Sequence, residues 1–454
     1  MRPQEAVEQA LTRSTADDCI VIAEESSTAN VRWANNTLTT NGVTRDRSLT
    51  CVAVVGASVG VVQRRGSVDV AELVAAADAA ARTAPPAEDA QPLIRGTATS
   101  SAWDAVPAET SMAAFSSFAP QLGEAFGTAQ AAKRLLFGYA EHEMRTTYLG
   151  SSSGVRLRHD QPTGHVEVNG KSLDFSRSAW VGAPAADFGS VDMTALDAEL
   201  ATRLRWAERR VDLPAGRYET ILPPSAVADL LIYMYWSASA RDAHDGRTVF
   251  SRAGGGTRVG ERLSDLPVTL RSDPGAAGLE CAPFVVAESS SGMQSVFDNG
   301  LGLGSTPWIA DGVLTSLVQT RHSAGLTGLP VTPWVDNLRL DGPDVGVPAG
   351  EMVAATDRGL LLTCLWYIRE VDPQTLLLTG LTRDGVYVVE GGEVVGAANN
   401  FRFNESPVSL LSRIAEIGAT ELTLPREQAD YFTRAAMPPL RIPDFNMSSV
   451  SQAA

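Results

Sequence analysis

Residues 217–242 read RYETILPPSAVADLLIYMYWSASARD and change character at Pro223-Pro224. The part before the prolines is typical of a strand, and the part after them is typical of a helix that is apolar on nearly every side. A helix without a polar face must be buried. We therefore expect a helix over 225–241 that is enclosed by the protein, at the junction of two domains.

The length of the chain and the order of its patterns predict those two domains. A chain of 454 residues is longer than one ordinary core supports. Before residue 212, helical periods alternate with segments of alternating polar and apolar residues. After about residue 245, short strands and Gly-rich turns dominate. We expect an α+β fold, with an N-terminal α+β domain (1–211) containing an antiparallel sheet and a β-rich C-terminal domain (212–454).

Among the elements expected in the N-terminal part, one helix and one turn have specific local signals. Residues 68–84 have helical spacing, and Ser67 stands where a helix cap is expected. His159 and His165 flank DQPTG (160–164), which is typical of a hairpin turn. Both histidines are therefore expected to be exposed at that turn.

The composition excludes several classes of function. The formal net charge is −16, and an acidic surface repels phosphate backbones, so we expect no nucleic-acid binding. No apolar run approaches the length that spans a bilayer, so we expect no membrane partner. The four cysteines form no CxxC pair, and the start of the chain lacks the apolar core of a signal peptide. These features favour a cytoplasmic protein.

His142-Glu143 is a pair of the kind that opens many zinc-peptidase motifs. Such a site requires a second histidine one helical turn later, so that both imidazoles reach one ion. Thr146 and Thr147 occupy those positions, and neither is a primary zinc ligand. The pair is expected in a strand, without a metal.

Three glycine-containing motifs also deserve comparison with known site patterns. Residues 56–60 fit G-x-S-x-G, but a serine-hydrolase elbow must lead into a helix, and the strand-like VVQRRG follows, which favours a hairpin. Residues 300–304 contain three alternating glycines, but Ser305 stands where the dinucleotide fingerprint requires another glycine. Residues 254–256 are consecutive glycines, which allow close approach of the backbone to another group.

The ordered series of segments resembles the TldD/TldE (PmbA) family over essentially the whole chain. The segments are VRWANNTLTTNGV (31–43), VGERLSDLPVTLRSD (259–273), SVFDNGLGLGSTPWIADGVLTSLVQTRHSAGLTG (295–328), PAGEMVAATDRGLLLT (348–363) and LTGLTRDGVYVVEGGEVVGAANNFRF (378–403). This resemblance implies a metallopeptidase complex that trims peptides. In that complex a TldD-type subunit carries zinc and a TldE-type subunit does not.

The resemblance also implies where zinc ligands would stand. The TldD-type motif is His-Glu-x-x-x-His on the helix that opens the C-terminal half, together with a Cys near the C-terminus. Its place in this chain is near Leu231–Trp236, yet no His, Cys, Asp or Glu occurs between Asp229 and Asp242. Neither Cys nor His occurs after Cys364. We expect no catalytic residue and no metal ligand in this chain, and zinc in a TldD-like partner of a heterodimer.

Two other functions remain open from the sequence. The chain could be an independent enzyme that uses metal-free chemistry, with Ser58, Cys364 or His322 as reactive groups. It could also be a standalone peptide-binding module. In the interpretation that the resemblance implies, the chain is a non-catalytic TldE-like subunit. Such a subunit would shape the peptide channel and support proteolysis by its partner.

The residues expected at the peptide channel or the subunit interface are glycines of two Gly-rich segments and one histidine that follows them in the same half of the chain. An extended peptide is commonly held by backbone pairing, which glycine-rich segments permit. These residues are Gly254, Gly255, Gly256, Gly302, Gly304 and His322.

Overall fold

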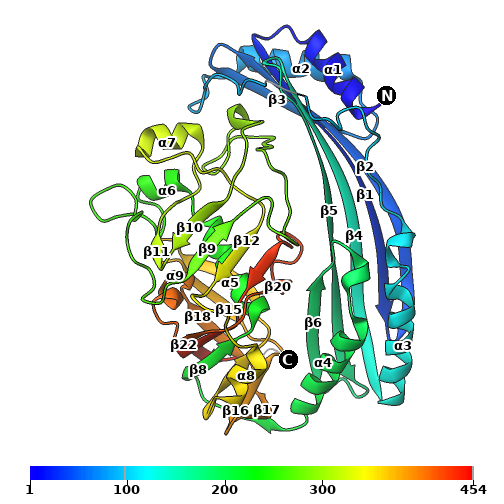
Figure 1. The fold of residues 1–454 in the computed structure, drawn as a ribbon, viewed down its shortest axis with the longest axis vertical. Helices are drawn as coiled ribbons and strands as arrows, with labels where there is room; N and C mark the ends of the chain where they lie inside the picture. Colours follow the sequence, from blue (N-terminus) through cyan, green and yellow to red (C-terminus); the bar gives the residue numbers. More distant parts are fainter. Residues whose placement is uncertain (97–98, 452–454) are drawn as a thin grey trace.

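The computed structural model describes residues 1–96 and 99–451, and its N-terminal part is a long antiparallel sheet (Figure 1). Within the described residues, six strands follow the order β3-β2-β1-β4-β5-β6. Their bounds are β1 (Asp18–Ala34), β2 (Thr37–Val55), β3 (Ser58–Arg65), β4 (Arg134–Ser151), β5 (Arg156–Ser172) and β6 (Ser178–Pro184). The sheet therefore forms the tall, curved wall on one side of the molecule.

The two faces of this sheet differ because side chains alternate along each strand. On the outer face, apolar residues of the strands pack against α1 (Pro3–Arg13), α2 (Val70–Thr83), α3 (Phe118–Ala131) and α4 (Met193–Trp206). Cys19, Val21 and Ala23 of β1 belong to this outer core. Their neighbours Ile20 and Ile22 face the other way and pack with Phe297 from the C-terminal half. The inner face therefore looks toward the rest of the chain.

The helices on the outer face begin at side chains that satisfy free backbone N–H groups. The Asp69 carboxylate accepts hydrogen bonds from the N–H groups of Ala71 and Glu72, so Asp69 caps α2. The prediction that Ser67 caps this helix is wrong, because the helix starts two residues later. Asp192 caps α4 in the same way, through the N–H of Ala195.

Residues 156–172 form one uninterrupted strand, so the predicted hairpin turn at 160–164 is wrong. β5 pairs with β4 from Arg156 to Ser172 without a break, and Met144 lies opposite Pro162. β6 pairs with β5 only from His165 to Lys171. Pro162 thus lies where β5 is an edge strand, which is where a sheet tolerates proline.

The G-x-S-x-G segment is the hairpin that the sequence predicts. β2 ends at Val55, Gly56 has φ +59°, and β3 begins at Ser58. Ser58 leads into strand β3 and not directly into a helix, so its hydroxyl does not lie on a nucleophile elbow.

The C-terminal half is rich in strands that form two further sheets in the described part of the chain. One has the order β11-β10-β9-β12-β21-β20. It contains β9 (Thr269–Ser272), β10 (Thr306–Ala310), β11 (Val313–Leu314), β12 (Leu338–Asp341), β20 (Glu421–Thr423) and β21 (Ala435–Met437).

The other sheet has the order β14-β15-β18-β22-β8-β13-β16-β17-β7, with β19 paired to β22. Its strands are β7 (Arg210–Val211), β8 (Gly216–Leu222), β13 (Arg358–Leu362), β14 (Trp366–Asp372), β15 (Leu377–Leu381), β16 (Val386–Glu390), β17 (Glu393–Ala398), β18 (Phe401–Glu405), β19 (Glu416–Ile417) and β22 (Leu440–Val450). The short helices of this half are α6 (Ala240–His244), α7 (Arg321–Thr327), α8 (Ala349–Ala354) and α9 (Pro407–Leu411). The fold is therefore α+β, as the sequence predicts.

The apolar helix is α5 (Pro224–Trp236), and it is buried inside the C-terminal half. It packs against β20, β21, β8 and α9, so its environment is the core between the two C-terminal sheets. Most of the helix is thus enclosed within the C-terminal half, and only its first residues, Pro224 and Ser225, reach a cavity that the N-terminal half also lines. The helix also ends earlier than predicted, and α6 follows as a separate short helix.

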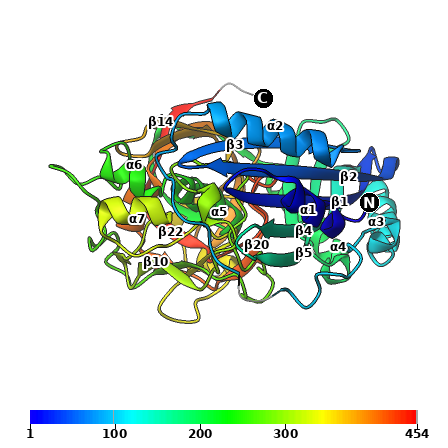
Figure 2. The same cartoon turned by 90° about the horizontal axis from the view of Figure 1, so that it is seen from above.

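The C-terminal half lies against the inner face of the N-terminal sheet (Figures 1 and 2). Near the end of the sheet that carries α1 and α2, Gln63 and Thr50 donate hydrogen bonds to Glu288. Near the other end, Arg426 pairs with Glu167 at 3.4 Å and stacks on Trp180. These two sets of contacts leave cavities between them.

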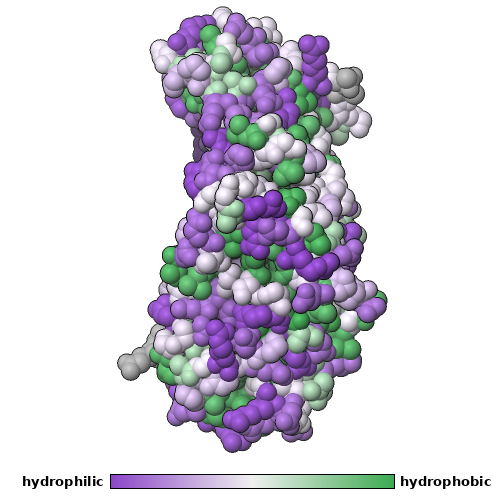
Figure 3. All heavy atoms as spheres, turned by 90° about the vertical axis from the view of Figure 1, so that its left-hand side faces the viewer, coloured by the Kyte–Doolittle hydropathy of each residue, from purple (hydrophilic) through white to green (hydrophobic). Residues whose placement is uncertain are grey.

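The exposed side of the C-terminal half is mostly hydrophilic, with apolar side chains scattered among polar ones (Figure 3). Among the described residues, no helix is long and apolar enough to cross a membrane.

Candidate functional site

The central cavity, about 600 Å³ in volume, lies between the inner face of the N-terminal sheet and the C-terminal half. The inner-face residues of β4 and β5 form one wall. Segments 282–303, 333–336 and 430–434 form the other. A smaller cavity beside Tyr139 shares Glu143, Thr163, Asp430 and Thr433 with it, so the groove continues along β4 and β5.

The wall formed by the sheet is polar because every second residue of its strands points into the groove. The lining residues from the sheet are Glu24, Glu143, Arg145, Thr147, His159, Gln161 and Thr163. His165 and Glu167 extend the same row into the adjoining cavity. His165 is buried, and His159 Nε2 donates a hydrogen bond to Gln161 Oε1 at 3.0 Å. The expectation of exposed turn histidines is wrong for both, because the strand does not turn.

Each wall of the central cavity carries a charged pair. Arg145 pairs with Glu143 at 2.9 Å, and Arg434 pairs with Asp336. The Asp336 side chain is 46% accessible, but that surface faces the cavity, so protein still surrounds the carboxyl. Burial raises the pKa of Asp336 above its usual range, while Arg434 opposes the shift. Burial likewise raises the pKa of Glu24.

An aromatic cluster closes the cavity where α5 ends. Tyr235 is fully buried and stacks on Trp334, with ring centroids 4.0 Å apart. Its hydroxyl accepts a hydrogen bond from the N–H of Val335 and donates one to that residue's carbonyl. Trp236 contacts Tyr431, which is 76% exposed. The end of α5 therefore packs behind Trp334 and Tyr431, whose rings line the cavity.

The residues of α5 do not fit a zinc ion. Zinc requires thiolate, imidazole or carboxylate ligands, and Leu230–Arg241 contains none of these side chains. Within residues 1–96 and 99–451, no group of three or more His, Cys, Asp or Glu side chains is arranged to hold a metal. His142 lies on the outer face of the sheet and contacts the Thr110 hydroxyl at 2.7 Å and the Ala186 carbonyl at 3.1 Å.

The glycines and the histidine predicted at a channel lie in separate places. Gly254 and Gly255 are exposed in a turn and have φ +90° and +110°. Gly302 and Gly304 are exposed on both sides of Leu303, which lines the central cavity. His322 lies on α7, where its Nε2 is 3.3 Å from Arg241. The remaining predicted residue, Gly256, belongs to the same turn as Gly255.

Gly300 explains why this loop reaches the sheet. It has φ +85°, and a side chain there would approach Val155 to 3.1 Å. A Cβ at Gly302 would meet nothing within 4 Å. The glycine that the loop geometry requires is thus Gly300. Gly302 pairs with Phe284 in a short antiparallel β-bridge, and both Gly302 and Gly304 have open space where a side chain would stand.

The proposed metal-free nucleophiles are not paired with a base. Cys364 is buried, and burial raises the pKa of its thiol to about 12, so it is not a thiolate at neutral pH. Ser58 lies at the β2–β3 hairpin, on the N-terminal sheet. His322 contacts Arg241 rather than either of these residues. The three do not form a catalytic arrangement of nucleophile and base.

Sequence reasoning missed most of the cavity lining. Trp334, Tyr431 and the charged row on β4 and β5 are far apart in the sequence, and only the fold brings them together. One signal was available: within HVEVNG (165–170), polar and apolar residues alternate, which is typical of a strand with one face in a polar environment.

Comparison with known protein families identifies the family that has this architecture. A family model described as the PmbA/TldA metallopeptidase C-terminal domain matches residues 215–449, which is more than half of the chain. The chain belongs to the PmbA/TldD family. The match starts just before β8 and includes α5 and the strands of both C-terminal sheets apart from β7. No curated protein sequence matches this PmbA/TldD-family chain.

Solved structures share the fold of this PmbA/TldD-family chain over nearly its full length. TldE from Thermococcus kodakarensis is 14% identical, with a TM-score of 0.80 and coverage of 98% of this chain and 99% of that one. A protein from Thermotoga maritima, described as a candidate modulator of DNA gyrase, is also 14% identical, with a TM-score of 0.78 and coverage of 98% and 99%. A Bacteroides thetaiotaomicron protein with a similar description is 12% identical, with a TM-score of 0.76 and coverage of 99% and 98%.

Proposed function

We propose that this chain is the non-catalytic, TldE-like subunit of a heteromeric TldD/TldE-type zinc metallopeptidase. One observation carries the proposal: the stretch of α5 where the related zinc motif would stand has aliphatic and aromatic side chains, and its end packs on the rings of Trp334 and Tyr431. Without zinc ligands, no bound water of lowered pKa is available as nucleophile. The zinc and the catalytic Glu would belong to the partner.

The central cavity supports a role in handling peptide. Its sheet wall offers carboxylates, guanidinium groups and amides in a row along β4 and β5, and its opposite wall offers aromatic rings. Polar groups that pair with a main chain, next to rings that pack on side chains, are typical of peptide grooves. In the assembled complex, this subunit would shape the channel that leads substrate to the zinc of its partner. We place this complex in the cytoplasm.

Co-expression with a TldD-type chain from the neighbouring gene tests this function. We expect the two chains to co-purify, with zinc retained and peptides cleaved by the complex. The isolated chain, purified without chelator, is expected to hold no stoichiometric zinc by elemental analysis and to cleave no peptide. One tightly bound zinc per isolated chain would contradict the proposal.

Two other outcomes would assign the chain to a different class. Peptide cleavage by the isolated chain that survives a chelator would identify an independent hydrolase. Peptide binding by the isolated chain, with no association with any zinc-bearing relative, would identify a standalone binding module.

Substitution of Gly302 by valine tests whether the 300–304 loop faces the channel or the partner. The isolated chain should accept the change, because a Cβ there meets nothing within 4 Å and the residue has no positive φ. We expect peptide cleavage by the complex to fall about tenfold, or the affinity between the chains to fall by a similar factor, since each corresponds to about 1.4 kcal/mol. Gly255→Val is a weaker test, because its φ of +110° adds strain.

The control for this test is Gly123→Val. Gly123 is exposed on α3, on the outer face of the sheet, and also has no neighbour within 4 Å of a Cβ. A loss of cleavage with zinc and assembly intact would indicate a channel role, and a loss of assembly would indicate an interface role. If Gly302→Val behaves like Gly123→Val in both assays, the loop is an ordinary surface turn.

A further inference from the structure

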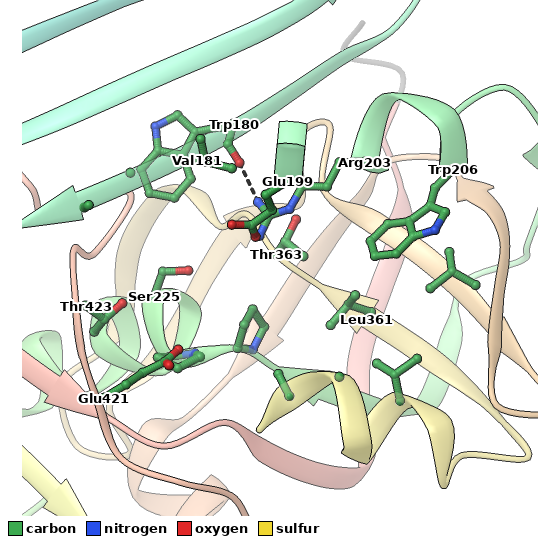
Figure 4. A pocket seen from close by; sticks show the side chains of 18 of the residues that line it. Trp180, Val181, Glu199, Arg203, Trp206, Ser225, Leu361, Thr363, Glu421 and Thr423 are labelled. Atoms are coloured by element: carbon green, nitrogen blue, oxygen red, sulfur yellow. Dashed lines mark hydrogen bonds and ion pairs between the residues drawn. The ribbon is translucent and has the colours of Figure 1, made fainter. Parts of the chain in front are cut away.

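The lower cavity, about 680 Å³ in volume, lies beyond the central cavity at the edge of the N-terminal sheet. Edge strand β6 and the end of α4 form one side of it. The start of α5, strand β20 and the β16–β17 turn form the other (Figure 4). It is thus enclosed by elements of both halves of the chain, and nothing in the proposed peptidase role uses it.

Three polar groups at one end of the lower cavity have no partner. Thr423 is only 8% exposed, yet its hydroxyl makes no hydrogen bond within residues 1–96 and 99–451. The Ser225 hydroxyl and the Glu421 carboxylate likewise have no hydrogen-bond or ion-pair partner in the described part of the chain. In Figure 4 these three side chains gather at the same end of the cavity, across from Trp180. The Thr423 side chain is thus enclosed by protein while its hydroxyl oxygen stays accessible from the cavity, so that oxygen can bind a group placed there.

Arg203 is the basic residue that lines this cavity, and its guanidinium group already has partners. Arg203 pairs with Glu199, one turn earlier on α4, and also donates to the main-chain carbonyl of Trp180 around the edge of the sheet. Glu421 therefore has no counter-ion among the lining residues that the structure describes. The Glu421 side chain keeps contact with solvent, yet the protein around the cavity still raises its pKa through partial burial, and the Glu199 carboxylate adds to the shift.

The other end of the lower cavity is apolar. Trp206 and Leu361 lie there in Figure 4, and the cavity lining also includes the apolar side chains of Val394 and Pro223. A ligand that fills the cavity would therefore contact an acidic and hydroxylic end and an apolar end at the same time, which is the usual composition of a small-molecule pocket.

We propose that the lower cavity binds a primary ammonium group carried on an apolar body. The three donors of an ammonium match the three free acceptors, which are the Glu421 carboxylate and the hydroxyl oxygens of Thr423 and Ser225. The apolar body would pack against Trp206 and Leu361. The same chemistry is offered by a free arylalkylamine and by the amino terminus of a peptide. The site does not depend on the zinc-bearing partner, so it can be tested on this chain alone.

Ligand-observed NMR on the full-length chain at pH 7.5 tests the site with matched probes. 2-Phenylethylamine is expected to bind with a Kd on the order of 1 mM, which is about −4 kcal/mol. 2-Phenylethanol, which has the same apolar body without the charge, should bind at least tenfold more weakly. The dipeptide amide Phe-Leu-NH₂ and its N-acetyl form distinguish the sources: binding that requires the free amino group in the dipeptide assigns the site to peptide termini. Binding of the amine alone assigns it to small amines.

Variants of the three acceptors provide the second half of the test. Glu421→Gln, at an exposed position of an edge strand, should weaken the amine at least tenfold. Thr423→Val should weaken it several-fold, and Thr423→Ser should restore most of the affinity. Glu72→Gln, at an exposed position of α2, is the control and should leave binding unchanged. Equal binding of amine and alcohol, or binding unaffected by Glu421→Gln in a protein with an unchanged unfolding midpoint, overturns the proposal.

Discussion

Asp229→Ala lowers the free energy of unfolding by about 3–5 kcal/mol, because it leaves buried backbone donors without an acceptor. Asp229 is the one acidic residue of α5, and it is fully buried. Its carboxylate accepts hydrogen bonds from the N–H groups of Arg426 at 3.1 Å, Glu427 at 2.8 Å and Gln428 at 3.2 Å. These bonds hold the 426–428 segment, which leads into the wall of the central cavity at 430–434. Urea unfolding followed by tryptophan fluorescence measures the effect.

Two variants calibrate this loss. In Asp229→Asn, the amide oxygen still accepts from the N–H groups of Glu427 and Gln428, but the amide NH₂ faces the N–H of Arg426. This substitution is expected to lower the free energy of unfolding by about 1–3 kcal/mol. Asp245→Ala removes a carboxylate at the end of α6 that is paired with Arg241 near solvent, and should cost at most about 1 kcal/mol. A loss for Asp229→Ala no larger than for Asp245→Ala would contradict the argument.

The pKa of Asp229 predicts that the free energy of unfolding depends on pH. Burial raises the pKa of Asp229 to about 8, although the three backbone N–H groups favour its charged form. In the unfolded chain an aspartate has a pKa of about 3.9. The folded state therefore binds more protons than the unfolded state between these values, and this group's contribution to stability falls as the pH rises from about 4 to about 8. Below about pH 4 the contribution no longer changes.

The comparison of wild type with Asp229→Asn isolates this term. The stability of the wild type relative to the variant should fall with a slope approaching about 1.4 kcal/mol per pH unit inside the window. Titrations elsewhere in the chain cancel in the difference. A difference that stays flat from pH 4 to pH 8 would mean that Asp229 is ionised throughout, with its hydrogen bonds outweighing burial.

Asp197→Ala is expected to cost about 3–5 kcal/mol, because it leaves a buried guanidinium unpaired. Asp197 on α4 and Arg134 at the start of β4 are both buried. Two parallel hydrogen bonds, of 2.6 and 2.9 Å, join their side chains. The pair docks α4 against the sheet, and α4 also supplies Glu199 and Arg203 to the lower cavity.

A double replacement separates the charge from the docking. Arg134→Met with Asp197→Leu removes both charges and fills the space with apolar atoms, so most of the lost stability should return. Asp192→Ala, which removes only the helix cap of α4, should cost about 1 kcal/mol. Thermal unfolding of the four proteins checks the order. A double variant as unstable as Asp197→Ala would show that the specific pair, and not the unpaired charge, governs stability here.

Several features follow from the sequence because they depend on neighbouring residues alone. Pro223-Pro224 ends a strand and starts α5, and the lack of polar residues after Asp229 requires burial of that helix. The hairpin at Gly56 follows from a glycine with positive φ between two β patterns. The absence of zinc ligands in 230–241 is a matter of side-chain identity, which no fold can change.

Other features arise only in the tertiary structure, because they depend on partners far along the chain. DQPTG has the composition of a turn, but continuous pairing with β4 keeps β5 extended through Pro162. The inner row from Glu143 to Thr163 would face solvent if the C-terminal half did not cover it. Asp229 meets its three donors across nearly 200 residues. Local patterns decide what a segment can form, whereas packing between distant segments decides which face becomes a cavity wall and which polar groups are left to bind something else.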